Sequence, residues 1–460
     1  MSLYTHLSSS FIFPLHERLK GHTSHALRQQ LEMSQWWSPD QLEALRTERL
    51  RAFLLDIGER VPYYRQLFEK QGFAPHQVQS TADLRRLPCL SKQDIRTHGD
   101  QFMADCHGPL ARYNTGGSSG EPLVFYISKA RKSHDVAAKW RATRWWGVDI
   151  GDPELVVWGS PIELGAQDRL RRLRDGLLRS HLLPAFDMSL RNLDRFIAVI
   201  QAKKPKMLFG YPSSLSLIAA HARQKKMALH RLGIRVVFVT SERLYDAQRQ
   251  VISEVFGCPV ANGYGARDAG FIAHQCPQGS LHISAEDIIV ETVRPNGQST
   301  EAGEAGEIVV THMATADFPF VRYRTGDRGV LDPAHCACGR GLPVLREVQG
   351  RATDFVVAQD GTVMHGLALI YAVRDLPGVE GFRIEQLSLD QIVVQVVASS
   401  AFDPSAEARI VHDFKKRLGE TVAVQVEKVG EIPAEPSGKY RYVSSRVKAF
   451  ADASWGASNA

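Results

Sequence analysis

The sequence predicts an α/β protein with a large N-terminal domain, in layered α/β subdomains and a β-subdomain, and a small α+β C-terminal domain. Three observations support this prediction. The chain has 460 residues, more than one ordinary hydrophobic core supports. Between residues 154 and 256, buried-type strands alternate with amphipathic helices, a pattern typical of layered structure with largely parallel strands. A further stretch of about a hundred residues near the C-terminus is long enough to fold as a separate unit.

The first hundred residues are expected to be mainly helical. Pro39 begins a pattern with Leu and Phe at helical spacing that runs to Leu55, and Pro62 interrupts it. Ser91 stands where a helix N-cap is expected. After a loop rich in Gly and Ser, residues 122–128 predict a strand and residues 134–146 a helix.

The alternating region is expected to contain strands at residues 155–158, 207–209 and 236–239, and helices at residues 191–202, from 213 and after 245. From about residue 284 the pattern changes to short strands and turns, such as residues 288–290 and 307–310. This change predicts a twisted β-subdomain.

A domain boundary is expected near residue 353. It divides the chain into an N-terminal domain of residues 1–352, a mobile C-terminal domain of residues 353–445 and a loose polar tail of residues 446–460. The elements expected in the C-terminal domain are strands at residues 354–357, 381–385, 392–397 and 422–426, and helices at residues 366–373 and 405–418.

Composition and charge narrow the function classes. An apolar fraction of 44% and a charged fraction of 23% are typical of a soluble globular enzyme. The net charge of +6 is mild and gives little reason to expect nucleic-acid binding. No apolar run is long enough to cross a bilayer, and the first residues lack the pattern of a secretory signal. We therefore expect a cytoplasmic protein without a membrane span; a homodimer is compatible with the sequence.

A loop rich in glycine and hydroxyl residues is the first candidate site. This glycine–serine loop consists of Thr115, Gly116, Gly117, Ser118, Ser119 and Gly120. Glycines let backbone N–H groups approach an anion, and hydroxyls donate to phosphate oxygens. Without further support such a cluster is more often an ordinary loop, and no Gly-Lys-Ser/Thr closes it as in a P-loop NTPase.

Three further motifs follow along the chain. They are Tyr-Arg-Thr-Gly-Asp at residues 323–327, Gly-Arg-Ala-Thr-Asp at 350–354 and Pro-Ser-Gly-Lys-Tyr-Arg at 436–441. In this order, the loop and the three motifs resemble the core motifs of the adenylate-forming superfamily. The strongest resemblance is to the phenylacetate-CoA ligases and their capsule-associated relatives, and it extends from about Trp36 to Lys439.

The resemblance implies the fold and reaction of that superfamily. ATP and Mg²⁺ would convert a small carboxylic acid, aromatic or apolar, into an acyl-adenylate, and the acyl group would pass to a thiol, most simply coenzyme A. Two alternatives remain open: the acceptor is an amine or a carrier-protein thiol, or the protein binds nucleotides in a regulatory role without turnover.

The resemblance also implies roles for single residues. The glycine–serine loop would hold the ATP phosphates, and Lys439 would act on the charge that develops during adenylation. Asp268 would bind Mg²⁺, although most relatives have Glu there, just as many have Lys in place of Glu121. The other nucleotide contacts would come from Ser241, Glu242, Gly263, Tyr264, Gly265, Asp327 and Arg351.

Two further groups of residues complete these expectations. Phe209, Tyr211, Pro212 and Gly263 would line the acid pocket, and Thr353 and Asp354 would form the hinge of the C-terminal domain. Ordinary explanations exist for several of these residues. Asp327 follows a glycine as a turn residue would, Ser241 could cap a helix, and Phe209 could belong to the core.

The cysteines suggest a metal site. Cys276, His282, Cys336 and Cys338 make a Cys₃His set, which is typical of structural zinc. The spacings are not those of a zinc finger, so reduced thiols in loops are the alternative. Similar residues occur in many phenylacetate-ligase relatives, which favours zinc. His274 is a spare candidate ligand.

Overall fold

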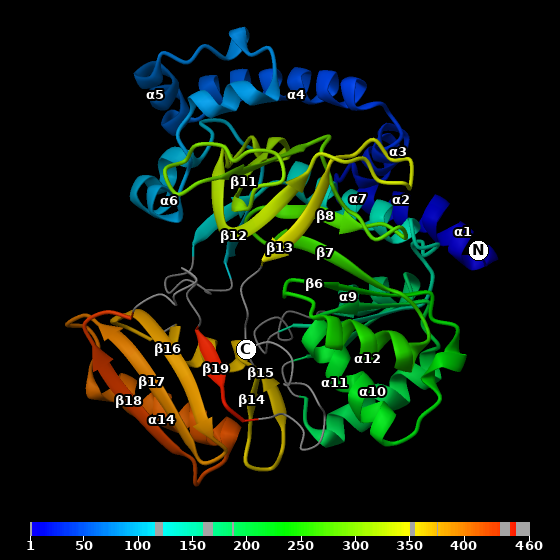
Figure 1. Cartoon of the computed structure of the whole chain (residues 1–460), viewed down its shortest axis with the longest axis vertical. Coiled ribbons are helices and arrows are strands. Elements are labelled where there is room, and N and C mark those ends of the chain that lie inside the picture. Colours follow the sequence, from blue (N-terminus) through cyan, green and yellow to red (C-terminus); the bar gives the residue numbers. More distant parts are fainter. Residues whose placement is uncertain are drawn as a thin grey trace. The chain divides into compact units, whose positions relative to one another are not determined.

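The computed structural model of the chain describes residues 2–115, 123–159, 169–185, 188–349, 355–374, 376–432 and 442–447. The chain forms two compact units (Figure 1). The first unit comprises residues 1–115, 123–152 and 261–350, and the second comprises residues 116–122, 153–260 and 351–460. No helix of the described residues is both long and apolar enough to cross a membrane.

The first unit begins with helices, as expected. They are α1 (Leu3–Leu7), the π-helical η1 (Ser8–Ile12), α2 (Phe13–Leu19), α3 (Ser24–Ser34), α4 (Pro39–Arg60), α5 (Pro62–Gln71), the 3₁₀ turns η2 (Pro75–Gln77) and η3 (Thr81–Arg86), α6 (Lys92–His98) and the 3₁₀ turn η4 (Gly99–Phe102). Ser38 caps α4 through a capping box with Gln41, and Ser91 caps α6 in the same way with Asp94. Helix α4 runs past Leu55 to Arg60, because the proline that interrupts the pattern is the first residue of α5.

An antiparallel sheet dominates the rest of the first unit. Its strands lie in the order β10 (Ile288–Val293), β11 (Gly306–His312), β12 (Tyr323–Asp332), β13 (Val344–Gln349), β9 (Leu281–Ile283), β8 (Gly270–Gln275) and β7 (Val260–Ala266). The antiparallel strands therefore begin at Val260, earlier than expected, because glycines interrupt the apolar pattern in β7. A separate hairpin joins β1 (Ala111–Asn114) to β2 (Val124–Ile127), and helix α7 (Lys129–Arg144) packs on α3.

The second unit contains parallel strands in the order β6 (Val236–Thr240), β5 (Met207–Gly210), β3 (Glu154–Trp158) and β4 (Ser180–Pro184). The helices that connect or follow them are α9 (Arg169–Leu177), α10 (Leu190–Lys203), α11 (Pro212–Gln224), η5 (Leu229–Leu232) and α12 (Asp246–Phe256). Figure 1 shows α10, α11 and α12 together in the green part of this unit. The prediction missed β4, an edge strand that is only partly buried and therefore has a weak apolar pattern.

The C-terminal residues form a smaller α+β structure, close to the predicted pattern. Its elements are β14 (Phe355–Val357), β15 (Val363–His365), α13 (Leu367–Arg374), β16 (Val379–Ser388), β17 (Gln391–Ala398), α14 (Pro404–Leu418), β18 (Ala423–Val429) and β19 (Val443–Ser445). Four strands pair in the order β18-β17-β16-β19, and α14 crosses between the parallel strands β17 and β18. The expected hinge residues Thr353 and Asp354 lie outside the described residues, so the boundary stays a prediction.

Candidate functional site

Several residues named from the sequence lie outside the described residues. They are Gly116, Gly117, Ser118, Ser119 and Gly120 of the glycine–serine loop, and Arg351 and Lys439. The base of the loop is described. Thr115 donates its backbone N–H to the Leu123 carbonyl at 3.0 Å, and its Oγ1 accepts from the Leu123 N–H, also at 3.0 Å. Two hydrogen bonds therefore join Thr115 and Leu123, the residues on either side of the loop, at the end of the β1–β2 hairpin.

The motif at residues 323–327 and the segment around Tyr264 come together in the first unit. The Tyr264 hydroxyl donates to Asp327 Oδ2 at 3.1 Å. The Thr325 hydroxyl donates to the Ile308 carbonyl at 2.9 Å, and its oxygen accepts from the Asp327 N–H at 3.1 Å. Two segments about sixty residues apart in the sequence thus form one polar site, with the Asp327 carboxylate half-buried.

The glycines of this segment have a structural reason. Gly263, Tyr264 and Gly265 lie within β7, which pairs with β8. A Cβ atom on Gly265 would lie 2.5 Å from the Gly270 carbonyl oxygen. Any other residue at position 265 would therefore push the two strands apart next to Tyr264.

Asp268 lies in the turn between β7 and β8 and is 6% exposed. Its Oδ2 accepts a hydrogen bond from the Tyr323 hydroxyl at 2.6 Å. Tyr323 begins β12, the strand that also carries Asp327, so this one strand contacts Asp268 and positions Asp327. Asp268 thus lies in the same unit as Tyr264 and Asp327, and its oxygens suit a hard cation such as Mg²⁺.

A buried arginine holds the turn of Asp268. Arg131 on α7 is 1% exposed, and its guanidinium lies 3.4 Å from the main-chain carbonyl oxygens of Arg267 and Asp268. The Arg131 Nε lies 3.1 and 3.0 Å from the two carboxylate oxygens of Asp135. The sequence did not indicate Arg131, because an i,i+4 pair with Asp135 is usually an exposed pair on a helix.

Two histidines lie beside this arginine. The rings of His134 and His312 are both fully buried, with centroids 4.8 Å apart. Together with Asp135 they form a compact group of possible metal ligands. Two features disfavour a cation there: Arg131 already neutralises Asp135, and His312 Nδ1 accepts the Ala314 N–H, which leaves the proton of a neutral ring on Nε2. We assign no metal to this group.

Burial makes His312 a source of acid sensitivity. Burial lowers the pKa of His312 well below its usual value, and the charges of Arg131 and His134 lower it further. The unfolded chain therefore binds this proton below about pH 6.5, whereas the folded protein does not.

The contribution of His312 to the free energy of unfolding should be fully present above pH 6.5. Below pH 6.5 this contribution should fall by about 1.4 kcal/mol per pH unit. Urea unfolding between pH 7.5 and pH 5 measures the slope. His312→Gln should flatten the slope, and replacement of the exposed His76 by glutamine should leave it unchanged. An equal slope in wild type and His312→Gln would contradict this assignment.

In the second unit, aromatic residues meet at the carboxyl ends of neighbouring parallel strands. Tyr211 follows β5, and its ring stacks on that of Trp158 at the end of β3, with centroids 4.3 Å apart. The ring centroid of Phe209 lies 6.0 Å from that of Trp158 and 5.8 Å from that of Phe238. Pro212 begins α11 directly after Tyr211. The sequence had not indicated Trp158 as a site residue, although ligands of parallel sheets bind at this strand end.

Glu242 lies beside the start of α11, the helix that begins at Pro212. Its Oε2 accepts from both the backbone N–H and the hydroxyl of Ser213 in the first turn of α11, where a negative charge is favourable. Ser241 has φ of 72°, a left-handed conformation that is uncommon outside glycine. The alternative that Ser241 caps the next helix is wrong, because α12 begins at Asp246 with Tyr245 as N-cap.

The four residues of the expected zinc site also come together, in the first unit. Their ligand atoms all lie within 4.8 Å of one another. Cys276 Sγ is 3.7 Å from Cys336 Sγ, and Cys338 Sγ is 3.2 Å from His282 Nε2. The spare candidate His274 is not in this group.

The surroundings of this group fit a metal. His282 Nδ1 lies 3.1 Å from the Leu342 carbonyl oxygen, which can only accept, so Nδ1 carries the proton and Nε2 is left with a lone pair. The Cys338 N–H donates to Cys336 Sγ at 3.4 Å, and Gly339 turns the chain with φ of 81°. Three sulfurs and one imidazole nitrogen match the closed tetrahedral sets of structural zinc.

Comparisons with known proteins agree with the motifs. Residues 356–446 match the family model described as the CapK C-terminal domain. Protein CapK of Staphylococcus aureus is 25% identical over 415 residues, which cover 88% of this chain and 89% of that protein. Phenylacetate-coenzyme A ligase of Thermus thermophilus is 25% identical over 436 residues, covering 88% of this chain and 96% of the enzyme. That of Escherichia coli is 27% identical over 417 residues, covering 86% and 93%.

A solved structure has the same fold. The 2-hydroxyisobutyryl-CoA ligase in complex with 2-HIB-AMP and CoA aligns with a TM-score of 0.62 and 21% identity, over 88% of this chain and 89% of that one. The resemblance inferred from the motifs is therefore confirmed: over most of its length this chain is similar to CapK and to phenylacetate-coenzyme A ligases, and it has the fold of the 2-hydroxyisobutyryl-CoA ligase.

Proposed function

We propose that the protein is an ATP-dependent acid–thiol ligase that forms AMP. A carboxylate oxygen attacks the α-phosphorus of ATP, and pyrophosphate leaves. A thiolate, that of coenzyme A, then attacks the acyl carbon of the adenylate, and AMP leaves. The observation that carries the proposal is similarity over almost the whole length of two phenylacetate-coenzyme A ligases.

The polar site of the first unit supports nucleotide binding. A carboxylate accepts two ribose hydroxyls well, and Tyr264 holds Asp327 from one side. In the proposed mechanism Asp268 binds Mg²⁺, which offsets charge on the phosphates. Glu242, Ser241 and Arg351 would contribute further contacts to the nucleotide, and the glycine–serine loop would cradle its phosphates.

The acid is proposed to be flat and apolar. The stacked rings of Trp158 and Tyr211 and the adjacent Phe209 offer an aromatic wall at the end of the parallel strands. Such walls favour aromatic or apolar ligands over highly polar ones. A small aromatic acid is therefore the first substrate to test.

Three further proposals complete this function. The C-terminal domain of residues 353–445 turns about Thr353 and Asp354 between the two steps, bringing Lys439 to the site and then withdrawing it. Zinc at Cys276, His282, Cys336 and Cys338 is structural. The reaction takes place in the cytoplasm, where ATP and coenzyme A are both at hand.

Pyrophosphate release with a panel of aromatic and aliphatic acids tests the first step. Adding coenzyme A, a carrier protein or an amine to the active acid identifies the acceptor by mass spectrometry of the product. A thioester of coenzyme A is the expected product. Absence of pyrophosphate release with every acid would contradict the proposed enzyme. An amide product would show that the acyl acceptor is an amine and not a thiol.

Replacing Asp268 by asparagine tests the magnesium contact. The change keeps the size and the acceptor for Tyr323 but removes the charge, so we expect a Mg²⁺ requirement raised roughly tenfold or more and slower adenylation. Titration of pyrophosphate release with MgCl₂ measures it. Tyr323→Phe is the matched control, because it removes the hydrogen bond and keeps the carboxylate. An unchanged Mg²⁺ dependence in Asp268→Asn would exclude Asp268 as a ligand.

A further inference from the structure

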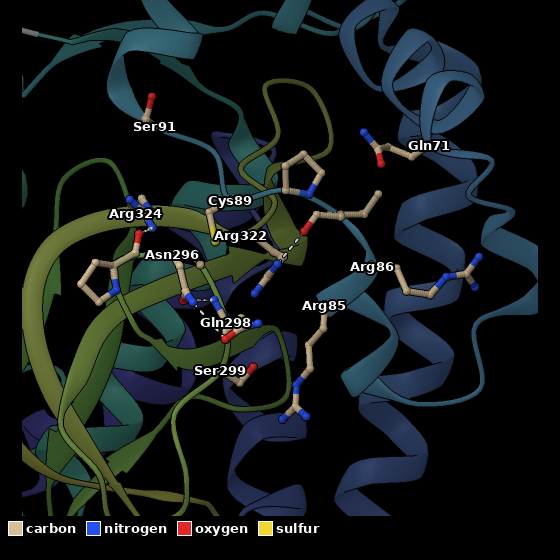
Figure 2. Close-up of a pocket in the computed structure, with 14 residues that line it drawn as sticks. Gln71, Arg85, Arg86, Cys89, Ser91, Asn296, Gln298, Ser299, Arg322 and Arg324 are labelled. Atoms are coloured by element: carbon tan, nitrogen blue, oxygen red, sulfur yellow. Dashed lines mark hydrogen bonds between the residues drawn. The ribbon is translucent and has the colours of Figure 1, made fainter.

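A pocket of about 770 Å³ opens in the first unit, and no step of the proposed reaction uses it (Figure 2). Its walls are the turn η3 with the chain that follows it, the start of β12, and the loop between β10 and β11. The volume is in the range of small-molecule sites in proteins.

The lining carries an excess of positive charge. Arg85, Arg86, Arg322 and Arg324 line the pocket, and no aspartate or glutamate does. Arg85 and Arg86 are exposed, and within the described part of the chain no carboxylate lies at ion-pair distance from either. Asp83, whose carboxyl pKa is lowered mainly by backbone hydrogen bonds, lies close enough to Arg86 for the guanidinium charge to help lower it. An anion in the pocket would therefore meet two arginines whose charge only Asp83, among the described carboxylates near them, partly offsets, and without an ion pair to break.

Arg322 is rigidly held. It is 3% exposed, its Nε and Nη2 lie 3.0 and 3.1 Å from the two carboxylate oxygens of Glu291, and its Nη1 donates to the Leu87 carbonyl at 2.5 Å. Its φ of 49° is a left-handed conformation, which an arginine retains only where its surroundings enforce it. The pocket floor is thus fixed before any ligand binds, which lowers the entropy cost of binding.

Hydrogen bonds also join the walls. Leu90 donates to the Arg322 carbonyl, and Arg324 donates back to the Leu90 carbonyl, each at 2.9 Å. Arg324 Nη2 donates to the Pro295 carbonyl at 3.1 Å, which ties the β10–β11 loop to β12. Figure 2 shows Arg324 and the loop on one side of the pocket and Arg85 and Arg86 on the other. Arg324 Nε also lies 3.6 Å from Glu307 Oε2. Positive charge therefore lies at two separated ends, and that of Arg324 is partly offset by Glu307.

The uncharged lining narrows the class of anion. Amides come from Gln71, Asn296 and Gln298, and hydroxyls from Ser91 and Ser299. These groups pair with hydroxyls and phosphate oxygens. No aromatic side chain lines the pocket, so a nucleobase would find no ring to stack on.

We propose that this pocket binds a phosphate ester of a polyhydroxy compound, with anionic groups at both ends, such as a sugar bisphosphate. Phosphate groups pair with Arg85 and Arg86 at one end and with Arg324 at the other. The amides and hydroxyls bind the carbon chain between them. The pocket is a binding site in addition to that for ATP and the acid.

Calorimetric titration of the full chain with fructose 1,6-bisphosphate tests the proposal. Saturable binding is expected, with fructose alone giving none. The double variant Arg85→Gln/Arg86→Gln should weaken it at least tenfold; both side chains are exposed, so folding should be unaffected. The matched control, Arg18→Gln/Arg346→Gln, removes two exposed positive charges of the same unit outside the pocket and should bind as wild type.

Three results would overturn the proposal. The first is the absence of saturable binding to wild type, and the second is equal weakening in the control, which would reduce the effect to net charge. The third is tighter binding of adenosine 3′,5′-bisphosphate than of fructose 1,6-bisphosphate, weakened by the pocket variant, which would make the pocket a site for the nucleotide end of coenzyme A. Binding needs no turnover, so a failure here leaves the proposed ligase function unaffected, and an inactive ligase leaves this test valid.

Discussion

Lys439→Ala should lower the rate of acyl-adenylate formation by roughly 10²–10³-fold, because an ammonium group aimed at developing negative charge stabilises the transition state more than the ground state. ATP binding and folding should change little. The lysine belongs to the Pro-Ser-Gly-Lys motif, in which a glycine would let the chain approach a ligand closely. Pyrophosphate release at saturating ATP and acid measures the effect.

Two comparisons make this result specific. Lys416→Ala removes an exposed lysine from α14 and should leave the rate unchanged. Transfer to coenzyme A from a supplied acyl-adenylate should survive in Lys439→Ala, because the proposed mechanism withdraws the lysine before that step. Equal rates of adenylation in the variant and wild type would disprove the proposed role, and loss of both steps would indicate damage to the domain.

The double variant Cys336→Ser/Cys338→Ser should lose bound zinc and melt on the order of 5–10 °C lower. A metal held by four ligands from segments distant in the sequence stabilises only the folded state, and its loss costs several kcal/mol. Elemental analysis should find about one zinc per chain in wild type, as a closed four-ligand site implies, and little in the variant. Differential scanning calorimetry measures the melting temperature.

Cys106→Ser is the matched control, since Cys106 is an exposed thiol outside the group. It should keep both the zinc and the melting temperature. Wild-type protein purified without chelators and free of zinc would rule out the site. If the double variant stays folded but loses adenylation entirely, the metal would have more than a structural role.

Local signals in the sequence were enough for many elements of the fold. Ser91 was predicted as a helix N-cap and accepts a hydrogen bond from the first turn of α6, and Ser38 and Asp403, which were not named, cap α4 and α14 in the same way. Four strands and both helices of the C-terminal region were predicted within a few residues, because they have regular apolar spacing, whereas the three-residue strands β15 and β19 were missed. The four residues proposed to bind zinc and the motif residues could also be named, since each residue type carries its chemistry with it.

Contacts between distant segments decided the rest. The hydrogen bond of Tyr264 to Asp327 depends on the strand order of an antiparallel sheet, which no local pattern encodes. Arg131 became a support of the Asp268 turn only because α7 packs against β8. Trp158 reached Tyr211 because two parallel strands pair in one register, and the arginine pocket arose where residues 85–91 meet β12. The sequence by itself determined which groups this protein can use, and the tertiary structure decided which of them meet, because side-chain chemistry is local whereas strand pairing and packing are not.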